Sequence, residues 1–379
     1  MTARLRGPAL FTAVALLVLV VAPLALDPFR LGLLAKYLCF AIAALGIGIA
    51  WGQGGMLTLG QGVFFGLGGY SMAMYLKLHD AGPGNLPDFM VWSGVERLPA
   101  LWKPFSSPVV AIAAAVLVPA AAATVLGLLV FRQRVRGAYF AILSQALAAA
   151  FVIWLVGQQG LTGGTNGLTH FYDVFGRDPE EDGSKRLFYF VVAVVLGALY
   201  LLARQLVKSR FGRLLVAVRD GEDRVRFLGY NPATVKTVAF AVSAAMAGIA
   251  GALYVPVVGI ISPSLLGVVP SIELVVAVAI GGRFSLAGAV LGGVLLNWAH
   301  TTFSEQYPSG WVYLQGLMFI LVIMLMPGGV AGGAQRAVQA VRRYRTRGGS
   351  ARRPETATAG AAGAAPPASA AEQPEVAAP

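Results

Sequence analysis

The chain has 379 residues, of which 57% are hydrophobic and only 12% charged, and its formal net charge is +12. Because an ordinary soluble domain is about 25% charged, this composition excludes a soluble protein and indicates that most of the surface faces lipid. The single cysteine, Cys39, excludes an internal disulfide, and no Cys/His spacing predicts a metal site. Basic residues lie between apolar segments and near the C-terminus, a pattern typical of membrane orientation and not of nucleic-acid binding.

Apolar segments recur along the chain at lengths suited to transmembrane helices, since a bilayer core of about 30 Å needs about 20 residues. Ten such spans are predicted, at residues 8–26, 31–50, 57–77, 107–130, 137–157, 187–207, 237–258, 266–282, 284–300 and 311–327. Arg4 and Arg6 precede the first span and predict a cytoplasmic N-terminus; an uncleaved anchor is favoured there over a signal peptide. The predicted fold class is therefore an all-α polytopic membrane protein with both termini in the cytoplasm.

The segments between these spans support that orientation. The short loop "FRQRVR" (131–136) is strongly basic and falls on the cytoplasmic side, as the positive-inside rule requires. Residues 78–106 and 158–186 form the longer outside loops, which are either solvated connections or a surface for a soluble partner. We expect a transmembrane domain over 1–330 and a cytoplasmic tail over 331–379, basic at first and then Ala/Pro-rich and disordered.

Polar residues within the spans indicate what the membrane domain does. Glu273 is taken as essentially the one ionisable group inside a span, and a structural and a functional role are both open for it. Neutral polar residues either bridge helices or together line a wet path for a small polar solute. The predicted substrate path consists of Gln53, Thr58, Gln61, Gln145, Ser243, Glu273 and Asn297.

Groups needed for catalysis are missing from this pattern. No nucleophile with a neighbouring base is visible, so a conduit is predicted and not an enzyme. The chain contains no Gly-Lys pair, so a Walker-type phosphate loop is absent and no cofactor is expected on this chain.

One charged segment, "SRFGRLLVAVRDGEDRVRFLGYNP" (209–232), interrupts the apolar sequence. Leu214, Val218, Val225 and Leu228 recur at helical spacing and predict an apolar stripe on short helices that end at Gly229. A helix lying on anionic lipid is one interpretation, but the acidic residues 220, 222 and 223 would be repelled there. A mixed-charge helical knob fits a groove on a protein partner better.

This segment resembles the coupling loop of ABC-transporter membrane subunits, which typically reads Glu-Ala-Ala, three residues, then Gly. Here Asp223 stands at the Glu place and Gly229 at the Gly place, while Arg224 and Val225 replace the two alanines. The motifs "GQGGMLTLGQGVFFGLGGYSMAM" (52–74), "VRGAYFAILSQALA" (135–148), "TGGTNGL" (162–168) and "FAVSAAMAGIAGALY" (240–254) surround it. In this order they resemble the LivM-like permeases of branched-chain amino acid ABC importers over roughly residues 30–330. Within that family the wording of 51–78, the loop 78–106 and "SPSLLGVVPSIELVVAVAIGGR" are most similar to the urea-importer permease.

The resemblance implies a permease subunit in the bacterial inner membrane that forms the path for urea in an ATP-driven importer. Branched-chain amino acids or short amides are the alternative substrates, and a stand-alone secondary transporter or channel is the alternative class. The implied partners are a second homologous permease subunit, two ATPase subunits that hold the ATP, an extracytoplasmic solute-binding protein and membrane lipid. The residues expected to dock on the ATPase are Arg213, Arg219, Asp220, Asp223, Arg224 and Gly229.

Overall fold

The computed structural model of the chain describes residues 21–135 and 137–307, with isolated residues between 310 and 332. The chain divides into one unit over Met1–Gln335 and a second over Arg336–Pro379. The predicted tail 331–379, apart from residue 332, lies outside the described residues, as do most of span 8–26 and most of span 311–327. The fold below is that of the first unit.

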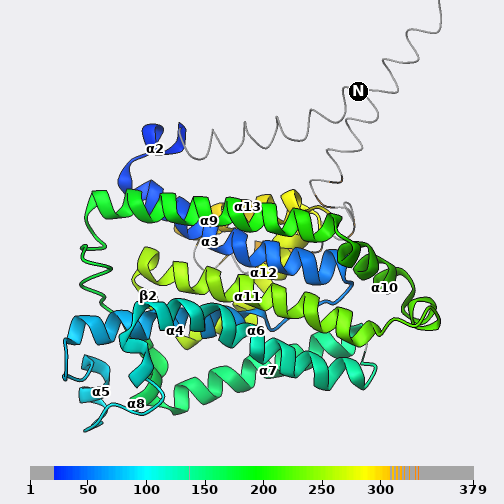
Figure 1. Cartoon of the computed structure of the whole chain (residues 1–379). Helices are drawn as coiled ribbons and strands as arrows, with labels where there is room; N and C mark the ends of the chain where they lie inside the picture. Colours follow the sequence, from blue (N-terminus) through cyan, green and yellow to red (C-terminus); the bar gives the residue numbers. More distant parts are fainter. Residues whose placement is uncertain are drawn as a thin grey trace, which may run out of the picture. The chain divides into compact units, whose positions relative to one another are not determined.

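Helices make up nearly all of this unit (Figure 1). In chain order the elements are α2 (Ala22–Ala25), α3 (Pro28–Ile47), the π-helix η2 (Gly48–Gln53), α4 (Gln61–Ala81), α5 (Asp88–Trp92), the 3₁₀-helix η3 (Lys103–Ser106), α6 (Pro108–Arg132), α7 (Ala138–Gly157), α8 (Gln159–Thr162), η4 (Gly164–Asn166), β1 (Leu168–Thr169), α9 (Asp182–Lys208), α10 (Arg210–Phe227), α11 (Pro232–Val258), β2 (Ile260–Ile261), η5 (Pro263–Leu266), α12 (Val268–Gly281) and α13 (Leu286–Gln306).

The predicted spans between residues 31 and 300 all coincide with helices, which confirms an all-α membrane architecture. In the described part of the chain, six helices are long and apolar enough to cross a membrane: Pro28–Gln53, α6, α7, α9, α11 and α13. Helix α12 is apolar but shorter, and α4 is not among the six. The number of ten spans and the orientation of the termini therefore stay predictions.

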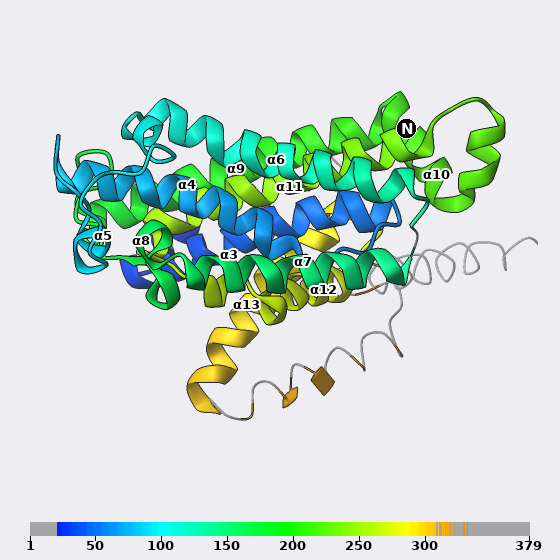
Figure 2. The ribbon, with the colours of Figure 1, turned by 90° about the horizontal axis from the view of Figure 1, so that it is seen from below.

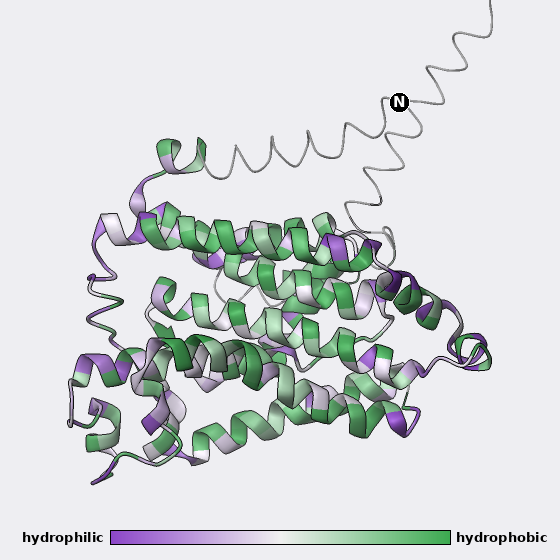
Figure 3. Cartoon of the chain, viewed as in Figure 1, coloured by the Kyte–Doolittle hydropathy of each residue, from purple (hydrophilic) through white to green (hydrophobic). Residues whose placement is uncertain are grey.

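Helices α3 and α11 form the centre of the bundle. Within the most apolar window of each, 78% and 67% of the residues are buried, against 22–28% in α6, α7, α9 and α13. The outer helices thus expose apolar side chains, such as Leu117, Ile153 and Leu202, and the hydropathy colouring of Figure 3 shows that apolar residues predominate along these helices. Such surfaces suit lipid or another membrane subunit, because water would not solvate them.

The packing of α4 on α11 depends on glycine. A Cβ added at Gly68 would lie 2.0 Å from the Gly248 carbonyl oxygen, and one at Gly251 would lie 1.9 Å from the Phe65 carbonyl oxygen. Both distances are far inside van der Waals contact, so only glycine allows these backbones to approach so closely. Gly62 and Gly292 are equally close-packed, since a Cβ added at Gly62 would lie 2.5 Å from the Leu266 carbonyl oxygen and one at Gly292 would lie 2.0 Å from the Ala277 carbonyl oxygen.

The connections gather at opposite ends of the bundle. In Figures 1 and 2, α5 and α8 lie at one end and α10 at the other. At the α5 end, β1 pairs antiparallel with β2, Leu168 facing Ile261. The buried Lys77 ammonium lies 2.9 Å from an Asp88 carboxylate oxygen, and Trp102 Nε1 donates to the Leu161 carbonyl at 3.0 Å. The segments 78–106 and 158–186 are therefore folded against each other and against α4, and are more than solvated connections.

Candidate coupling helix and solute path

Helix α10 is bounded at both ends by residues that favour helix termini. The Ser209 hydroxyl accepts a hydrogen bond from the Gly212 N–H at 3.3 Å, which caps the start. The backbone leaves helical geometry at Gly221, and Gly229 follows the end with φ +86°, in the left-handed region that favours glycine. The predicted pair of short helices ending at Gly229 is confirmed, and Figure 2 shows it beside the end of the helix bundle.

The buried face of α10 differs from the predicted stripe. Gly212, Leu215, Val218 and Val225 are buried, whereas Leu214 is half-buried and Leu228 is 76% exposed. Leu228 was therefore wrong as a stripe position, whereas Leu214 is partly buried and packs against the core together with the buried Val218 and Val225. The break at Gly221 resets the helical phase, and Leu228 lies just beyond the last helical residue.

The predicted docking residues separate into an exposed group and one inward residue. Arg213, Asp220, Asp223, Arg224 and Gly229 are exposed at the α10 end. Arg219 turns inward: its Nη1 donates to the Gly52 carbonyl at 2.8 Å, and its guanidinium lies 5.3 Å from the centre of the Phe284 ring. Its Nε also donates to an Asp220 oxygen at 2.8 Å, and this hydrogen bond lowers the pKa of the Asp220 carboxyl below its usual value. Arg219 thus ties α10 to its own chain.

A second anchor, which the sequence reasoning missed, joins α10 to α11. The Lys236 ammonium lies 2.5 Å from one Glu222 carboxylate oxygen, and both side chains are only 10% exposed. Arg226 Nη2 lies 3.3 Å from the other oxygen of Glu222. The signal available in the sequence was a lysine next to the apolar span 237–258, where a buried charge requires a partner.

The Phe284 ring that Arg219 contacts belongs to the turn between α12 and α13, where further side chains pack. The Arg283 guanidinium stacks over Phe284 at 4.6 Å and lies 5.4 Å from the Trp51 ring centre. Gln53, a predicted path residue, is buried there, and its Nε2 donates to the Phe284 carbonyl at 3.3 Å. The end of η2, the α12–α13 turn and α10 therefore form one packed junction.

Three predicted path residues meet deep in the bundle, where α4 begins. Thr58, Gln61 and Ser243 are fully buried. Gln61 Nε2 donates to the Ser243 carbonyl at 3.1 Å and lies 3.0 Å from its hydroxyl. Among the described residues, Thr58 Oγ1 and Gln61 Oε1 have no hydrogen-bond partner.

The backbone just before α4 is not helical, and α4 begins beside the middle of α11, where Gln61 contacts Ser243. Serine hydroxyls satisfy backbone N–H groups on both sides of this helix start. Leu59 N–H donates to Ser144 Oγ at 2.9 Å, and Gly62 N–H donates to Ser271 Oγ at 3.0 Å. Irregular backbone at membrane depth is tolerated only where protein buries it or where it lines a cavity. Gln145, also predicted for the path, is half-buried on α7, and no described hydrogen bond joins it to this cluster.

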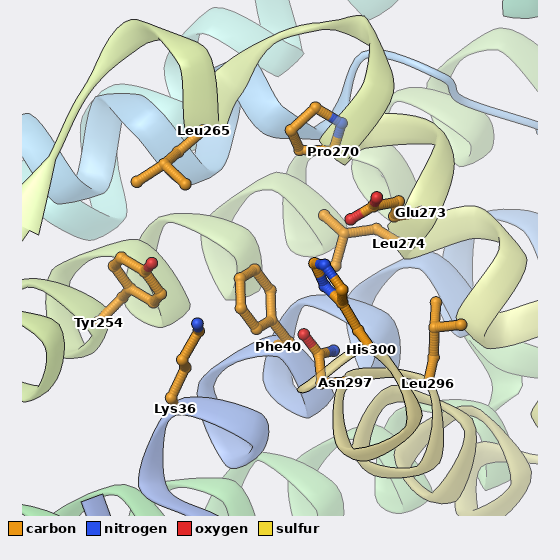
Figure 4. Close-up of a pocket in the computed structure, with 10 residues that line it drawn as sticks. All are labelled: Lys36, Phe40, Tyr254, Leu265, Pro270, Glu273, Leu274, Leu296, Asn297 and His300. Atoms are coloured by element: carbon orange, nitrogen blue, oxygen red, sulfur yellow. The ribbon is translucent and has the colours of Figure 1, made fainter. Parts of the chain in front are cut away.

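The other two predicted path residues line a separate cavity of about 220 Å³, shown in Figure 4. It lies towards the end of the bundle that carries α5 and α8, since α3 contributes from its first half and η5 follows β2. Its lining comes from α3, α11, η5, α12 and α13. The lining residues are Lys36, Phe40, Tyr254, Leu265, Pro270, Glu273, Leu274, Leu296, Asn297 and His300.

The cavity corrects one prediction. Glu273 is not the one ionisable group inside a span, because Lys36 on α3 and His300 on α13 line the same cavity. Lys36 was visible in the sequence as a lysine within the apolar span 31–50. Within the described residues, no group of three His, Cys, Asp or Glu side chains could hold a metal ion.

Comparison with known proteins agrees with this architecture. Residues 29–326 match the family described as the branched-chain amino acid transport system / permease component. The chain is 28% identical over 332 residues to the high-affinity branched-chain amino acid transport permease LivM of Salmonella typhimurium, covering 82% of this chain and 72% of that protein. The LivM of Escherichia coli K12 is 28% identical over 333 residues, with the same coverage of both chains. The autoinducer 2 import permease LsrC of Escherichia coli O9:H4 is 29% identical over 127 residues, which cover 31% of this chain and 37% of that protein. No solved structure matches the chain significantly.

The match covers most of the chain, including every helix from α3 to α13. The chain therefore belongs to this family of ABC-importer permease components, which confirms the LivM-like resemblance. It is a transport subunit and not an enzyme, and it resides in the bacterial inner membrane, where its apolar helices are solvated by lipid. Membership of the family implies that the chain works with ATPase and solute-binding partners.

Proposed function

We propose, from this family membership, that the chain is the membrane-spanning permease of an ATP-driven importer and that its substrate is a branched-chain amino acid. Both LivM relatives carry that substrate in their names and align over 82% of this chain. The observation that carries the transport mechanism is α10, a rigid charged helix pair anchored to the bundle at the end opposite α5 and α8.

Urea is the second candidate substrate, and one observation favours it. Thr58 Oγ1 and Gln61 Oε1 are buried hydrogen-bond acceptors without a partner among the described residues. Urea presents N–H donors and no net charge, so it would satisfy both groups without a counter-ion. The specific likeness to a urea-importer permease rests on sequence wording alone.

In this proposal the ATPase subunits hold the ATP and grip α10 from the cytoplasm. The exposed charges of α10 have mixed sign, with Arg213 and Arg224 beside Asp220 and Asp223. Mixed charge fits a protein groove of complementary pattern better than an anionic membrane surface, which would repel the acids. The assembly contains a second, homologous permease subunit, and no cofactor is bound by this chain.

The opposite end of the bundle then faces a solute-binding protein outside the cell. Trp92 is 80% exposed there, and Tyr172 is 73% exposed, although both belong to well-folded connections. Exposed aromatic side chains on an ordered surface are typical of protein interfaces.

The junction around Arg219 provides a physical route from ATPase to solute. A movement of α10 acts through Arg219 on Gly52 and on Phe284. Phe284 lies in the turn between α12 and α13, and these two helices carry Glu273 and Asn297 into the cavity. A displacement of this turn therefore moves two walls of the cavity relative to α3 and α11.

Reconstitution tests the proposal. The chain is placed in proteoliposomes with its second permease subunit and the ATPases, and uptake of radiolabelled leucine is measured with its binding protein and ATP. We expect uptake to require ATP, and the double variant Asp223→Ala with Arg224→Ala to abolish ATPase association and uptake. Lys208→Ala, at an exposed position at the end of α9 and outside α10, serves as the matched control and leaves both unchanged.

Two other results would change the conclusion. ATP-dependent uptake of urea without leucine would establish the second candidate substrate. Gradient-driven movement of either solute by this chain alone would show a stand-alone transporter and contradict the proposal.

A further inference from the structure

We propose that the cavity between α3, α11, α12 and α13 binds an amino acid zwitterion, with Glu273 receiving its ammonium group and Lys36 its carboxylate. This inference rests on the proposed import of a branched-chain amino acid and assigns the recognition of that substrate to named side chains. The sequence patterns predicted no role for Lys36 or His300.

Two opposite charges face this cavity from different helices. Lys36 comes from α3 and Glu273 from α12. Among the described residues, neither takes part in an ion pair within 4 Å. Figure 4 shows them at different sides of the cavity, with Phe40 and His300 drawn between them. Charged groups at membrane depth are costly, and they pair with one another or mark the path of a substrate.

A zwitterion resolves this cost with one molecule, because an α-amino acid carries its ammonium and carboxylate groups on the same carbon atom. A solute without charge, such as urea, would leave both protein charges uncompensated. A simple anion or cation would neutralise one side chain and leave the other alone. The pair of charges therefore selects amino acids over the other small solutes considered for this chain.

The remaining walls fit a small apolar side chain. Phe40, Leu274 and Leu296 contribute apolar surface, and Leu265 and Pro270 extend it. The cavity volume of about 220 Å³ corresponds to about seven water molecules at about 30 Å³ each, which suits a small solute. It lies below the roughly 300–1,000 Å³ of pockets for drug-sized ligands.

The polar lining completes the recognition of the charged end. The Tyr254 hydroxyl belongs to α11, and Asn297, on α13, has its Nδ2 directed to the Gly293 carbonyl at 2.8 Å. The side-chain oxygen of Asn297 takes part in no described hydrogen bond, so it remains an acceptor for the solute in the cavity wall. Because Glu273 and Asn297 lie on the helices joined by the Phe284 turn, a movement at that turn alters their distance from Lys36 and releases the solute.

Protection from chemical labelling tests this site in the assembled complex. In a Cys39→Ala background, Leu296→Cys places the one thiol of this chain in the cavity wall, and its rate of reaction with a small methanethiosulfonate is measured in vesicles. We expect L-leucine to slow the reaction and urea to leave it unchanged. The probes 4-methylpentanoate, which lacks the ammonium group, and leucinamide, which lacks the carboxylate, should protect only weakly.

Single variants test the ammonium contact at Glu273 and the carboxylate contact at Lys36 separately. Glu273→Gln and Lys36→Met should each raise the leucine concentration for half-protection by about 30-fold or more, the effect of removing one partner from a buried charge contact. Lys36→Met should also weaken protection by 4-methylpentanoate but not by leucinamide, and Glu273→Gln should show the reverse. Lys36→Arg keeps the charge and should retain protection, and Arg30→Met, on an exposed position of the same helix, is the matched control.

The outcomes separate this inference from the proposed function. A complex that imports leucine with ATP but shows no leucine protection of Leu296→Cys, or no labelling at all, overturns the site and leaves the function standing. Equal protection by urea also overturns it. A complex protected by leucine that does not import it with ATP contradicts the function, while the binding site stands.

Discussion

Replacement of Lys236 by methionine is the most informative test of how α10 is held. Methionine keeps the length and apolar character of the lysine stem but removes the ammonium group that lies 2.5 Å from Glu222. The Glu222 carboxylate is then left with 10% side-chain exposure and with Arg226 at 3.3 Å on its other oxygen. Removal of one partner of a buried ion pair costs about 3–5 kcal/mol, because the remaining charge is poorly solvated.

The expected loss is smaller than that range because Arg226 remains. We expect Lys236→Met to lower the free energy of unfolding by about 2–3 kcal/mol, and the double variant Glu222→Leu with Lys236→Met to recover most of this loss. The measurement is equilibrium unfolding of the purified chain in mixed micelles, carried out as a double-mutant cycle. Lys208→Met, at an exposed position at the end of α9, is the matched control and should change stability by less than about 0.5 kcal/mol.

Two results would refute this reasoning. A change of less than about 0.5 kcal/mol for Lys236→Met would show that solvent or other groups stabilise Glu222 without it. A double variant as unstable as the single one would show that the methionine itself packs badly and that charge is not the cause.

The remaining predictions concern helix packing, coupling and the polar cluster. Gly251→Ala should destabilise the chain by about 1–3 kcal/mol, since the added Cβ would lie 1.9 Å from the Phe65 carbonyl oxygen. Gly197→Ala is the control, because a Cβ there has no neighbour within 4 Å, and it should be neutral or stabilising by up to about 1 kcal/mol. Thermal unfolding in detergent compares the two variants. Arg219→Met should leave ATPase association intact but lower leucine uptake per ATP hydrolysed, because the hydrogen bond to Gly52 and the contact with Phe284 are lost; an unchanged ratio of uptake to hydrolysis would contradict the route through that junction. Thr58→Val should not destabilise the chain, since the buried hydroxyl has no partner among the described residues, and a fall in uptake without a fall in stability would place Thr58 on the solute path.

Periodicity and span length predicted the helical architecture well, and the reasons are local. Apolar stretches of about 20 residues can satisfy their backbone in lipid only as helices, so α3, α6, α7, α9, α11 and α13 follow directly from the sequence. The early end of α10 at Gly229 also follows from a local rule, because glycine adopts positive φ without strain.

Features that depend on tertiary contact were missed. Glu222 reads as one of several surface acids, and only the fold brings Lys236 of α11 beside it. The irregular segment before Gln61 was expected to be helical within span 57–77, but Ser144 of another helix satisfies the Leu59 N–H in it, and Ser271 satisfies the Gly62 N–H in the first turn of α4. Leu228 was predicted on the apolar stripe because the helical spacing was assumed to continue past Gly221, but the backbone leaves helical geometry at that residue.

The candidate site likewise has features that residue type predicts and features that depend on tertiary contact. Gln61 and Ser243, both predicted for the substrate path from residue type, are buried and hydrogen-bonded to each other, and their place on the path stays a prediction. Their separation from Glu273 and Asn297, which line another cavity, depends on helix packing that the sequence alone does not specify. Lys36 is a single charge within an apolar span, and such a charge is by itself a reason to expect a partner or a substrate nearby.

The sidedness of α10 tests the central claim most directly. A cysteine introduced as Arg224→Cys in the Cys39→Ala background is labelled with a membrane-impermeant maleimide in right-side-out and in inverted vesicles. We predict rapid labelling only in inverted vesicles, and protection of the cysteine when the ATPase subunits are added back. Labelling from the outside of intact right-side-out vesicles, or no protection by the ATPases, would contradict the claim that α10 is the contact between the permease and its motor.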